Sequence, residues 1–207
     1  MNVCFPGTLV PRKGKKAGEL FEGLFFATKG ITLSQVREIT GLDTTSIQNW
    51  VGRGWVPRPV DKRYSANHLA RIILINMLRN VTRLENVAKI MTYINGSPEC
   101  REDDVISETE LYIAVCDILD KADYETILSP GALNNMISHT LTVRGYIEPF
   151  PGGRTRLENG IKLILFYYSA SIIKVRADRL SQELGLGGDA PDCVLSVQIE
   201  EEFEEET

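Results

Sequence analysis

A glycine between two short amphipathic segments constrains the fold of this chain more than any other feature. Thr32 suits the N-cap of a helix over residues 33–40, and Gly41 with Leu42 supplies a tight turn after it. A second helix is expected over residues 43–53. The inward positions of the two helices are apolar at helical spacing: Leu33, Val36, Ile39, Ile47, Trp50 and Val51. Two short helices joined by such a turn predict a helix-turn-helix within a mainly α fold.

The second helix is expected to present a polar face. Asp43 or Thr44 caps its start, and Gly54 ends it. Its outward positions are polar without being acidic: Thr44, Thr45, Gln48, Asn49 and Arg53. The amides of Gln and Asn pair bidentately with adenine, and Arg binds guanine or phosphate. This face therefore predicts a recognition helix for the major groove of DNA.

A short basic loop and two more helices follow. Residues 55–57 are apolar, and Pro57 and Pro59 stiffen the chain. The run Asp-Lys-Arg-Tyr at 61–64 predicts a small basic wing beside the recognition helix. Ser65 caps the next helix, and another is expected from Arg83 to Ile94. These segments predict a winged helix-turn-helix domain over residues 19–96.

Charge is distributed unevenly along the chain. Up to Gly96, 14 basic residues accompany 6 acidic ones, whereas the remainder carries 9 basic and 22 acidic residues. A basic half joined to an acidic half indicates a polyanionic partner for the first and a different role for the second.

The order of these features resembles the N-terminal domain of the MerR family of regulators. The resemblance covers about residues 31–94 and rests on five stretches: Ile31–Val36, Thr40–Leu42, Ser46-Ile47, Gly54–Pro57 and Lys62–Ser65. More closely, residues 46–51 and 62–70 look like a bacterial family of MerR-like proteins described as a domain of unknown function. That likeness continues through residues 93–96 and 108–112. The resemblance implies a winged helix-turn-helix that binds DNA as a dimer.

Several positions depart from the MerR pattern. Gln48 replaces the usual Arg of the recognition helix, and Asn49 replaces a Tyr. Arg37 stands where a small residue normally packs between the two helices, the wing is shorter, and Lys62 stands where the wing Arg is expected. The resemblance therefore implies the helix-turn-helix geometry, but not MerR-style operator recognition or promoter untwisting.

The rest of the chain divides into three further segments. Residues 1–18, which are rich in Pro, Gly and Lys, predict a flexible basic arm. Residues 97–184 predict an acidic helical region for dimerisation or partner binding, with helices over 107–119, 132–142 and 157–184. Residues 185–207 predict an acidic tail with a candidate strand at 194–199. The resemblance implies a dimer through a long helix, but we see no sustained heptad repeat over 157–184, which leaves the mode of dimerisation open.

Little in the sequence indicates an enzyme or a metal site. His68 lies in the first turn of a helix, where a solvated or capping role is expected, and His139 is isolated. The four cysteines show no paired spacing: Cys4, Cys100, Cys116 and Cys193. Cys116 falls on the apolar side of its helix, which favours a buried thiol. We therefore expect no catalytic residue, no metal and no cofactor.

These observations predict a cytoplasmic transcriptional regulator that is a homodimer and binds double-stranded DNA. No signal peptide or membrane-spanning stretch is visible. The expected DNA-binding residues are Thr44, Thr45, Gln48, Asn49, Arg53, Arg58, Lys62, Arg63 and Tyr64. The base readers among them are Thr45, Gln48 and Asn49. The alternative is an interaction adaptor that keeps the helix-turn-helix as a scaffold and works through the acidic half. Such an adaptor would cover the face of Gln48, Asn49 and Arg53, which a regulator leaves exposed. The sequence leaves any small-molecule effector unknown.

Overall fold

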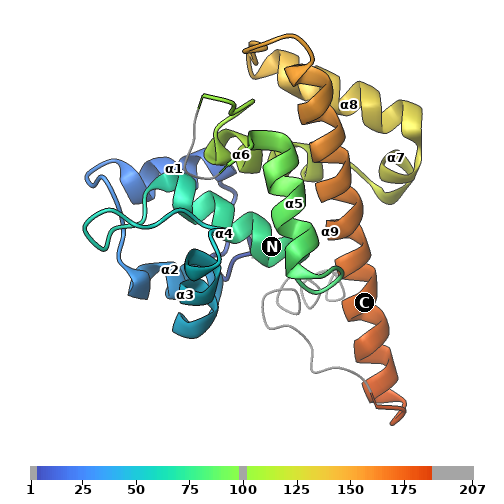
Figure 1. Ribbon diagram of the computed structural model, residues 1–207. Coiled ribbons are helices and arrows are strands. Elements are labelled where there is room, and N and C mark those ends of the chain that lie inside the picture. Colours follow the sequence, from blue (N-terminus) through green and yellow to red (C-terminus); the bar gives the residue numbers. More distant parts are fainter. Residues whose placement is uncertain (1–3, 98–101, 188–207) are drawn as a thin grey trace.

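The protein is mainly helical. The computed structural model describes residues 4–97 and 102–187, and Figure 1 shows its helices gathered around one body with a long helix along one side. The helices of this described part are α1 (Ala17–Phe25), α2 (Leu33–Thr40), α3 (Thr44–Gly52), α4 (Ala66–Leu78), α5 (Leu84–Asn95), α6 (Glu108–Leu119), α7 (Tyr124–Leu128), α8 (Pro130–Val143) and α9 (Gly153–Glu183). β-Pairing among these residues is limited to isolated bridges, which join Cys4 to Pro11, Ile31 to Tyr64 and Val60 to Arg63.

Helix α4 is the centre of the fold. Every residue from His68 to Leu78 is buried, and all of them except His68, Arg71 and Asn76 are apolar, as is typical of a helix that other elements cover on all sides. Helix α2 packs against α4, and so do α5, α6 and α9. Helices α7 and α8 complete the packing around α6 and α9. A single hydrophobic cluster consequently runs from Phe5 to Val175.

The expected boundary near residue 96 does not separate two cores. Helix α6 belongs to the acidic half by sequence, but it packs against α1 and α4 of the basic half. Leu111, Tyr112 and Val115 of α6 are fully buried in the shared cluster. The charge asymmetry therefore lies on the surface, whereas the interior is continuous.

The N-terminal segment is packed, which differs from the flexible arm expected from its composition. Phe5 is buried in the core. The Tyr112 hydroxyl donates a hydrogen bond to the Pro6 carbonyl at 2.9 Å, and the Asn76 amide donates to the Gly7 carbonyl at 3.0 Å. Gly7 has a φ of +72°, and a Cβ atom there would lie 2.6 Å from Met77. The glycine that suggested flexibility therefore permits close contact with α4.

Most expected helices are present with small shifts in their bounds. Thr32, Ser65 and Ser107 cap α2, α4 and α6, each accepting a backbone hydrogen bond through its side chain. Helix α9 begins at Gly153, earlier than expected, and the short α7 was not predicted from the sequence. The candidate strand at 194–199 lies outside the described residues. Within the described part, no helix is both long enough and apolar enough to cross a membrane.

Candidate nucleic-acid interface

Helices α2 and α3 are joined by a three-residue turn whose geometry follows from its residues. Gly41 has a φ of +69°, and its N–H donates to the Arg37 carbonyl at 2.8 Å, which ends α2. Leu42 is buried and anchors the turn to the core. Asp43 caps α3, accepting from the Ser46 N–H at 2.9 Å and from the Ser46 hydroxyl at 2.6 Å. These hydrogen bonds from Ser46 lower the pKa of the Asp43 carboxyl.

Helix α3 buries one face and exposes the other. Ile47 and Trp50 are buried against the core. Thr45, Gln48 and Asn49 are exposed, whereas Thr44 is half-buried. The exposed face carries two amides and a hydroxyl and no carboxylate between Asp43 and the end of the helix. Such side chains are free to read hydrogen-bonding groups on a partner.

A tight hairpin turn lies beside α3. Its central residues, Asp61 and Lys62, have φ values of +49° and +58°, and the Arg63 N–H donates to the Val60 carbonyl at 2.8 Å. Positive φ at both central positions is the pattern of a type I′ turn, the usual two-residue hairpin connection. Arg58, Lys62 and Arg63 are all exposed on this loop. Two of these cations, Arg58 and Lys62, line a hollow together with Gln48 of α3.

The base of this loop is fixed to the strand-like residue before α2. Ile31 and Tyr64 exchange both backbone hydrogen bonds, at 2.9 and 2.8 Å. A Cβ atom on Gly30 would lie 2.8 Å from the Cβ of Arg63, so the two backbones can approach this closely only with glycine at position 30. Tyr64 is only 4% exposed, and burial raises the pKa of its hydroxyl. The structure thus buries Tyr64 beneath the loop, whereas most of the other predicted residues are exposed.

Arg53 is exposed but engaged within the chain. Its guanidinium lies 4.9 Å from the centre of the Trp55 ring and 3.1 Å from the Glu85 carboxylate at the start of α5. Both side chains of this ion pair are more than half exposed, so the pair is weak and can exchange for another anion. Arg53 is therefore available to a phosphate only after it leaves Glu85.

Hollows flank α3 on two sides. One has a volume of about 680 Å³ and lies between the start of α2, the end of α3 and the loop. Its lining combines apolar and polar groups: Thr32, Leu33, Ser34, Gln48, Val51, Gly52, Arg58, Pro59, Lys62 and Tyr64. The other, of about 390 Å³, lies between α3 and the start of α5 and includes Asn49, Arg53 and Arg83. The exposed face of α3 is therefore a ridge between two depressions.

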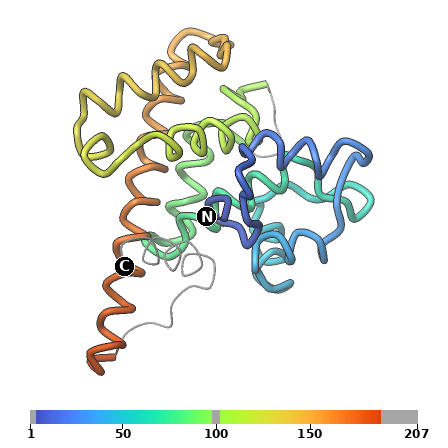
Figure 2. Tube along the Cα trace, turned by 180° about the vertical axis from the view of Figure 1, so that it is seen from behind, coloured from blue at the N-terminus to red at the C-terminus, as the bar shows by residue number. Residues whose placement is uncertain are grey.

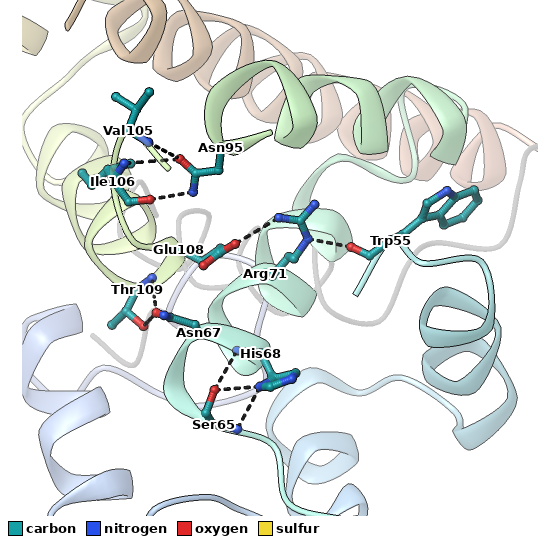
Figure 3. Close-up of polar contacts among 10 residues, drawn as sticks. All are labelled: Trp55, Ser65, Asn67, His68, Arg71, Asn95, Val105, Ile106, Glu108 and Thr109. Carbon is teal, nitrogen blue, oxygen red and sulfur yellow. Dashed lines mark hydrogen bonds and ion pairs between the residues drawn. The ribbon is translucent and has the colours of Figure 1, made fainter. Parts of the chain in front are cut away.

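His68 holds the start of the loop against α4. Its Nδ1 accepts from the Ser65 N–H at 3.2 Å (Figure 3). Its Nε2 lies 3.3 Å from the Arg58 carbonyl. With Nδ1 as an acceptor, Nε2 carries the proton and donates to that carbonyl. The capping role expected for His68 is confirmed, but the side chain is buried rather than solvated.

A buried ion pair connects the end of α3 to the acidic half. Arg71 on α4 donates from Nε to the Trp55 carbonyl at 2.6 Å and from Nη1 to the Glu108 carboxylate at 3.0 Å (Figure 3). Both side chains are at most 5% exposed. Burial lowers the pKa of Arg71, and the Glu108 carboxylate opposes that effect.

Two amides extend this polar connection. The side-chain oxygen of Asn67 accepts from the Thr109 hydroxyl at 2.7 Å, and the Asn95 amide donates to the Ile106 carbonyl at 2.6 Å. Figure 3 shows that these contacts line the junction between α4, α5 and the start of α6. This junction was not predicted from the sequence, although a lone Arg inside the apolar run of residues 69–78 was a signal that a buried partner would be needed.

Residue types that bind metals or undergo redox chemistry do not form a cluster in the described part of the chain. Among residues 4–97 and 102–187, no group of three or more His, Cys, Asp or Glu side chains is positioned to hold a metal ion. Cys116 is buried, as its helical position predicted, and burial raises the pKa of its thiol to about 12. Cys100 and Cys193 lie outside the described part of the chain.

Comparisons with known proteins place a family match over this same region. Residues 25–115 match a domain of unknown function (DUF1836), a stretch that contains α2 to α5, the loop and both ends of the Arg71–Glu108 pair. The uncharacterized protein YkrK of Bacillus subtilis is 27% identical over 99 residues, which cover 46% of this chain and 42% of YkrK. The chain thus spans less than half the length of this relative. No solved structure matches. Neither comparison names a MerR-like regulator, so the chain is similar over its candidate interface to a domain of unknown function.

Proposed function

We propose that this protein is a transcriptional regulator that binds double-stranded DNA as a homodimer. The observation that carries the proposal is the exposed polar face of α3, which carries Thr45, Gln48 and Asn49. Gln48 lines one hollow together with the exposed loop cations Arg58 and Lys62. Amides on a helix read base edges, and cations bind the phosphate backbone. In this proposal the protein acts in the cytoplasm and has no catalytic role.

The proposal treats the region as a winged helix-turn-helix of the MerR-like kind. Helices α2 and α3 are the helix-turn-helix, and α3 is the recognition helix. The type I′ turn at 60–63 is a minimal wing, since its backbone pairing is an isolated bridge rather than a ladder. Helices α4 and α5 follow the wing, in the order that the sequence resemblance implies.

The proposed contacts fall into two classes. Thr45, Gln48 and Asn49 read bases, and Thr44 supports them from a half-buried position. Arg58, Lys62 and Arg63 bind phosphates, joined by Arg53 once it exchanges Glu85 for a phosphate. Tyr64 acts indirectly, because it is buried at the base of the wing.

Selection from random-sequence duplex DNA at two salt concentrations tests this proposal. Purified protein should enrich a palindromic site, because a two-fold dimer places two recognition helices on related half-sites. Affinity should fall steeply as salt rises, with a slope set by the number of phosphates bound. No retention of DNA at low salt would contradict the proposal.

One observation favours the alternative of an interaction adaptor. The 680 Å³ hollow beside α3 includes Leu33, Val51 and Pro59 in its lining, and apolar concave surfaces suit protein side chains as well as nucleic acid. An adaptor would bind a protein partner through this hollow with little dependence on salt. The selection experiment separates the two functions, since an adaptor enriches no DNA sequence.

A further inference from the structure

The larger hollow beside α3 combines apolar walls with positive charge. Its apolar walls include Leu33, Val51 and Pro59, and its charged groups are the exposed Arg58 and Lys62. None of the described residues that line it carries a carboxylate. Its volume of about 680 Å³ lies within the range of ligand pockets, roughly 300–1,000 Å³. An occupant of matching chemistry therefore combines apolar side chains with negative charge.

Residues 188–207 of this chain have that composition. They contain eight acidic residues and neither Lys nor Arg. Leu195, Val197 and Ile199 alternate with two polar residues, so in an extended chain the three apolar side chains share one side. Three glutamates follow directly at 200–202. An apolar row thus leads into a run of negative charge, which matches the two kinds of group in the hollow.

The segment begins where it can reach the hollow. The description of the chain ends at Gly187, just beyond α9. Figures 1 and 2 show the end of α9 projecting from the other helices in the lower half of both views, where α2 and α3 also lie. A chain of 20 residues spans up to about 66 Å when extended, whereas a globular chain of 187 residues has a radius of gyration of about 16 Å. Residues 188–207 are therefore long enough to reach α2 and α3.

We propose that residues 188–207 bind in this hollow and compete there with DNA. The apolar row at 195–199 contacts the apolar walls, and the glutamates at 200–202 lie near Arg58 and Lys62. A phosphate group would neutralise these two cations but would supply no apolar surface for the walls. The segment supplies both, which makes it the more complementary occupant when no DNA is present.

The regulatory consequence of this inference rests on the proposed function. Gln48 is a proposed base reader, Arg58 and Lys62 are proposed phosphate contacts, and all three line the hollow. The segment and a duplex therefore exclude each other. A linked segment has an effective concentration of about 1 mM. If the free peptide binds with a Kd of about 100 μM, the linked segment lowers the affinity for DNA about tenfold.

Binding of a peptide tests the inference without DNA. The probe is a fluorescent peptide of residues 188–207, followed by anisotropy, and the protein is the full chain with Leu195→Ser, Val197→Ser and Ile199→Ser. These three substitutions (the serine variant) stop the chain's own segment from competing. The peptide should bind the serine variant with a Kd of about 100 μM, as expected for a weak contact that becomes effective only when linked.

Two lysine substitutions in the serine variant locate the peptide. Lys62→Ala should weaken peptide binding several-fold, because Lys62 lines the hollow. Lys89→Ala is the matched control, since Lys89 is exposed on α5 and is not among the lining residues. No binding at roughly 1 mM peptide would overturn the inference. An equal loss in both lysine variants would overturn it as well, because it would show general charge attraction rather than binding in the hollow.

Affinity for the selected duplex tests the competition in the full chain. The serine variant should bind the duplex about tenfold more tightly than the wild type. Its net charge is unchanged, so weaker repulsion between the acidic segment and DNA cannot produce this gain. The matched control, Ser196→Thr with Gln198→Asn, alters the other side of the extended segment and should bind like the wild type. Equal affinities for the serine variant and the wild type would contradict the competition.

The two experiments separate this inference from the proposed function. Failure of the protein to bind any duplex would contradict the proposed function, and the peptide measurement would still decide whether the segment binds in the hollow. Failure of the peptide to bind would contradict this inference alone and leave the hollow to DNA or to a partner protein.

Discussion

Helices α3 and α9 each present a face that the described residues leave open to solvent, and the two faces differ in chemistry. The face of α3 carries a hydroxyl and two amides and lies beside the cations of a tight loop. The face of α9 carries Leu, Phe, Ile and Ala in heptad spacing. The side chains of an exposed face therefore indicate which kind of partner it can bind. Polar groups with adjacent cations suit a nucleic acid, whereas a row of apolar side chains suits another helix.

The two faces are supported by one core. Arg71 contacts the Trp55 carbonyl just after α3 and the Glu108 carboxylate at the start of α6, and α6 packs against α9. The polar face of α3 and the apolar face of α9 therefore rest on one hydrophobic cluster, and we expect the two regions to unfold together. The predictions that follow test this connection first and then the local geometry on the α3 side.

Removing the buried cation should have the largest effect on stability. Arg71→Ala leaves the Glu108 carboxylate buried without its partner, which costs about 3–5 kcal/mol of unfolding free energy. Urea denaturation followed by circular dichroism measures this loss. Replacing the pair by Arg71→Met with Glu108→Leu should recover most of the stability, because no unpaired charge remains.

The shape of the same denaturation curve tests whether the two regions unfold together. A single transition is expected for both the wild type and Arg71→Ala, because the hydrophobic cluster is continuous. Two separate transitions would mean that the basic and acidic halves are independent domains, as the sequence alone had suggested.

Adding a side chain at the base of the 60–63 loop should have an intermediate effect on stability. Gly30→Ala places a Cβ atom 2.8 Å from the Cβ of Arg63, and the resulting shift should cost about 1–3 kcal/mol. Gly23→Ala is the matched control, because its Cβ would meet nothing within 4 Å on helix α1. The control should leave stability unchanged or raise it by about 0.5–1 kcal/mol. Equal thermal midpoints for the two variants would contradict the close approach.

The smallest effect concerns the cap of α3. Because the pKa of Asp43 is lowered in the folded protein, its contribution to stability is present above the ordinary carboxyl pKa of about 3.9 and is lost as the pH falls through the folded value. Asp43→Asn keeps a good N-cap without a titrating group. The difference in thermal midpoint between the two proteins should therefore change between pH 6 and pH 3, with the wild type losing more. A constant difference across this range would show that the carboxylate does not act as the cap.

The structure around α3 could largely be predicted from the sequence, because the residues that determine it lie close together in the chain. Thr32, Gly41 and Asp43 act on residues within three or four positions, so their caps and turn could be inferred from spacing alone. The loop at 61–64 was expected, but burial of Tyr64 depends on Ile31, which lies 33 residues away in the sequence. Long-range partners of this kind leave no signal in a periodic pattern.

The α9 side required the structure. Its long helix was expected, but the exposed apolar face of Leu163, Phe166, Ile173 and Leu180 could be recognised only after the burial of the opposite face was known. The N-terminal segment was misjudged for a related reason, because Pro and Gly that favour flexibility in isolation also allow a chain to pack closely on a helix. The ion pair of Arg71 with Glu108 could not be predicted from the sequence either, because Glu108 lies across the expected domain boundary.

The central claim is that α3 reads DNA sequence while the adjacent loop holds the phosphate backbone. The most direct test is a titration of the selected duplex and a scrambled duplex with the wild type, Gln48→Ala with Asn49→Ala, and Lys62→Ala, at several salt concentrations. We predict that the α3 variant loses roughly 10- to 100-fold in affinity for the selected duplex and keeps its affinity for the scrambled one. Lys62→Ala should weaken both duplexes alike and reduce the salt slope by about 1. If the α3 variant binds the selected duplex as tightly as the wild type does, α3 is not the recognition helix.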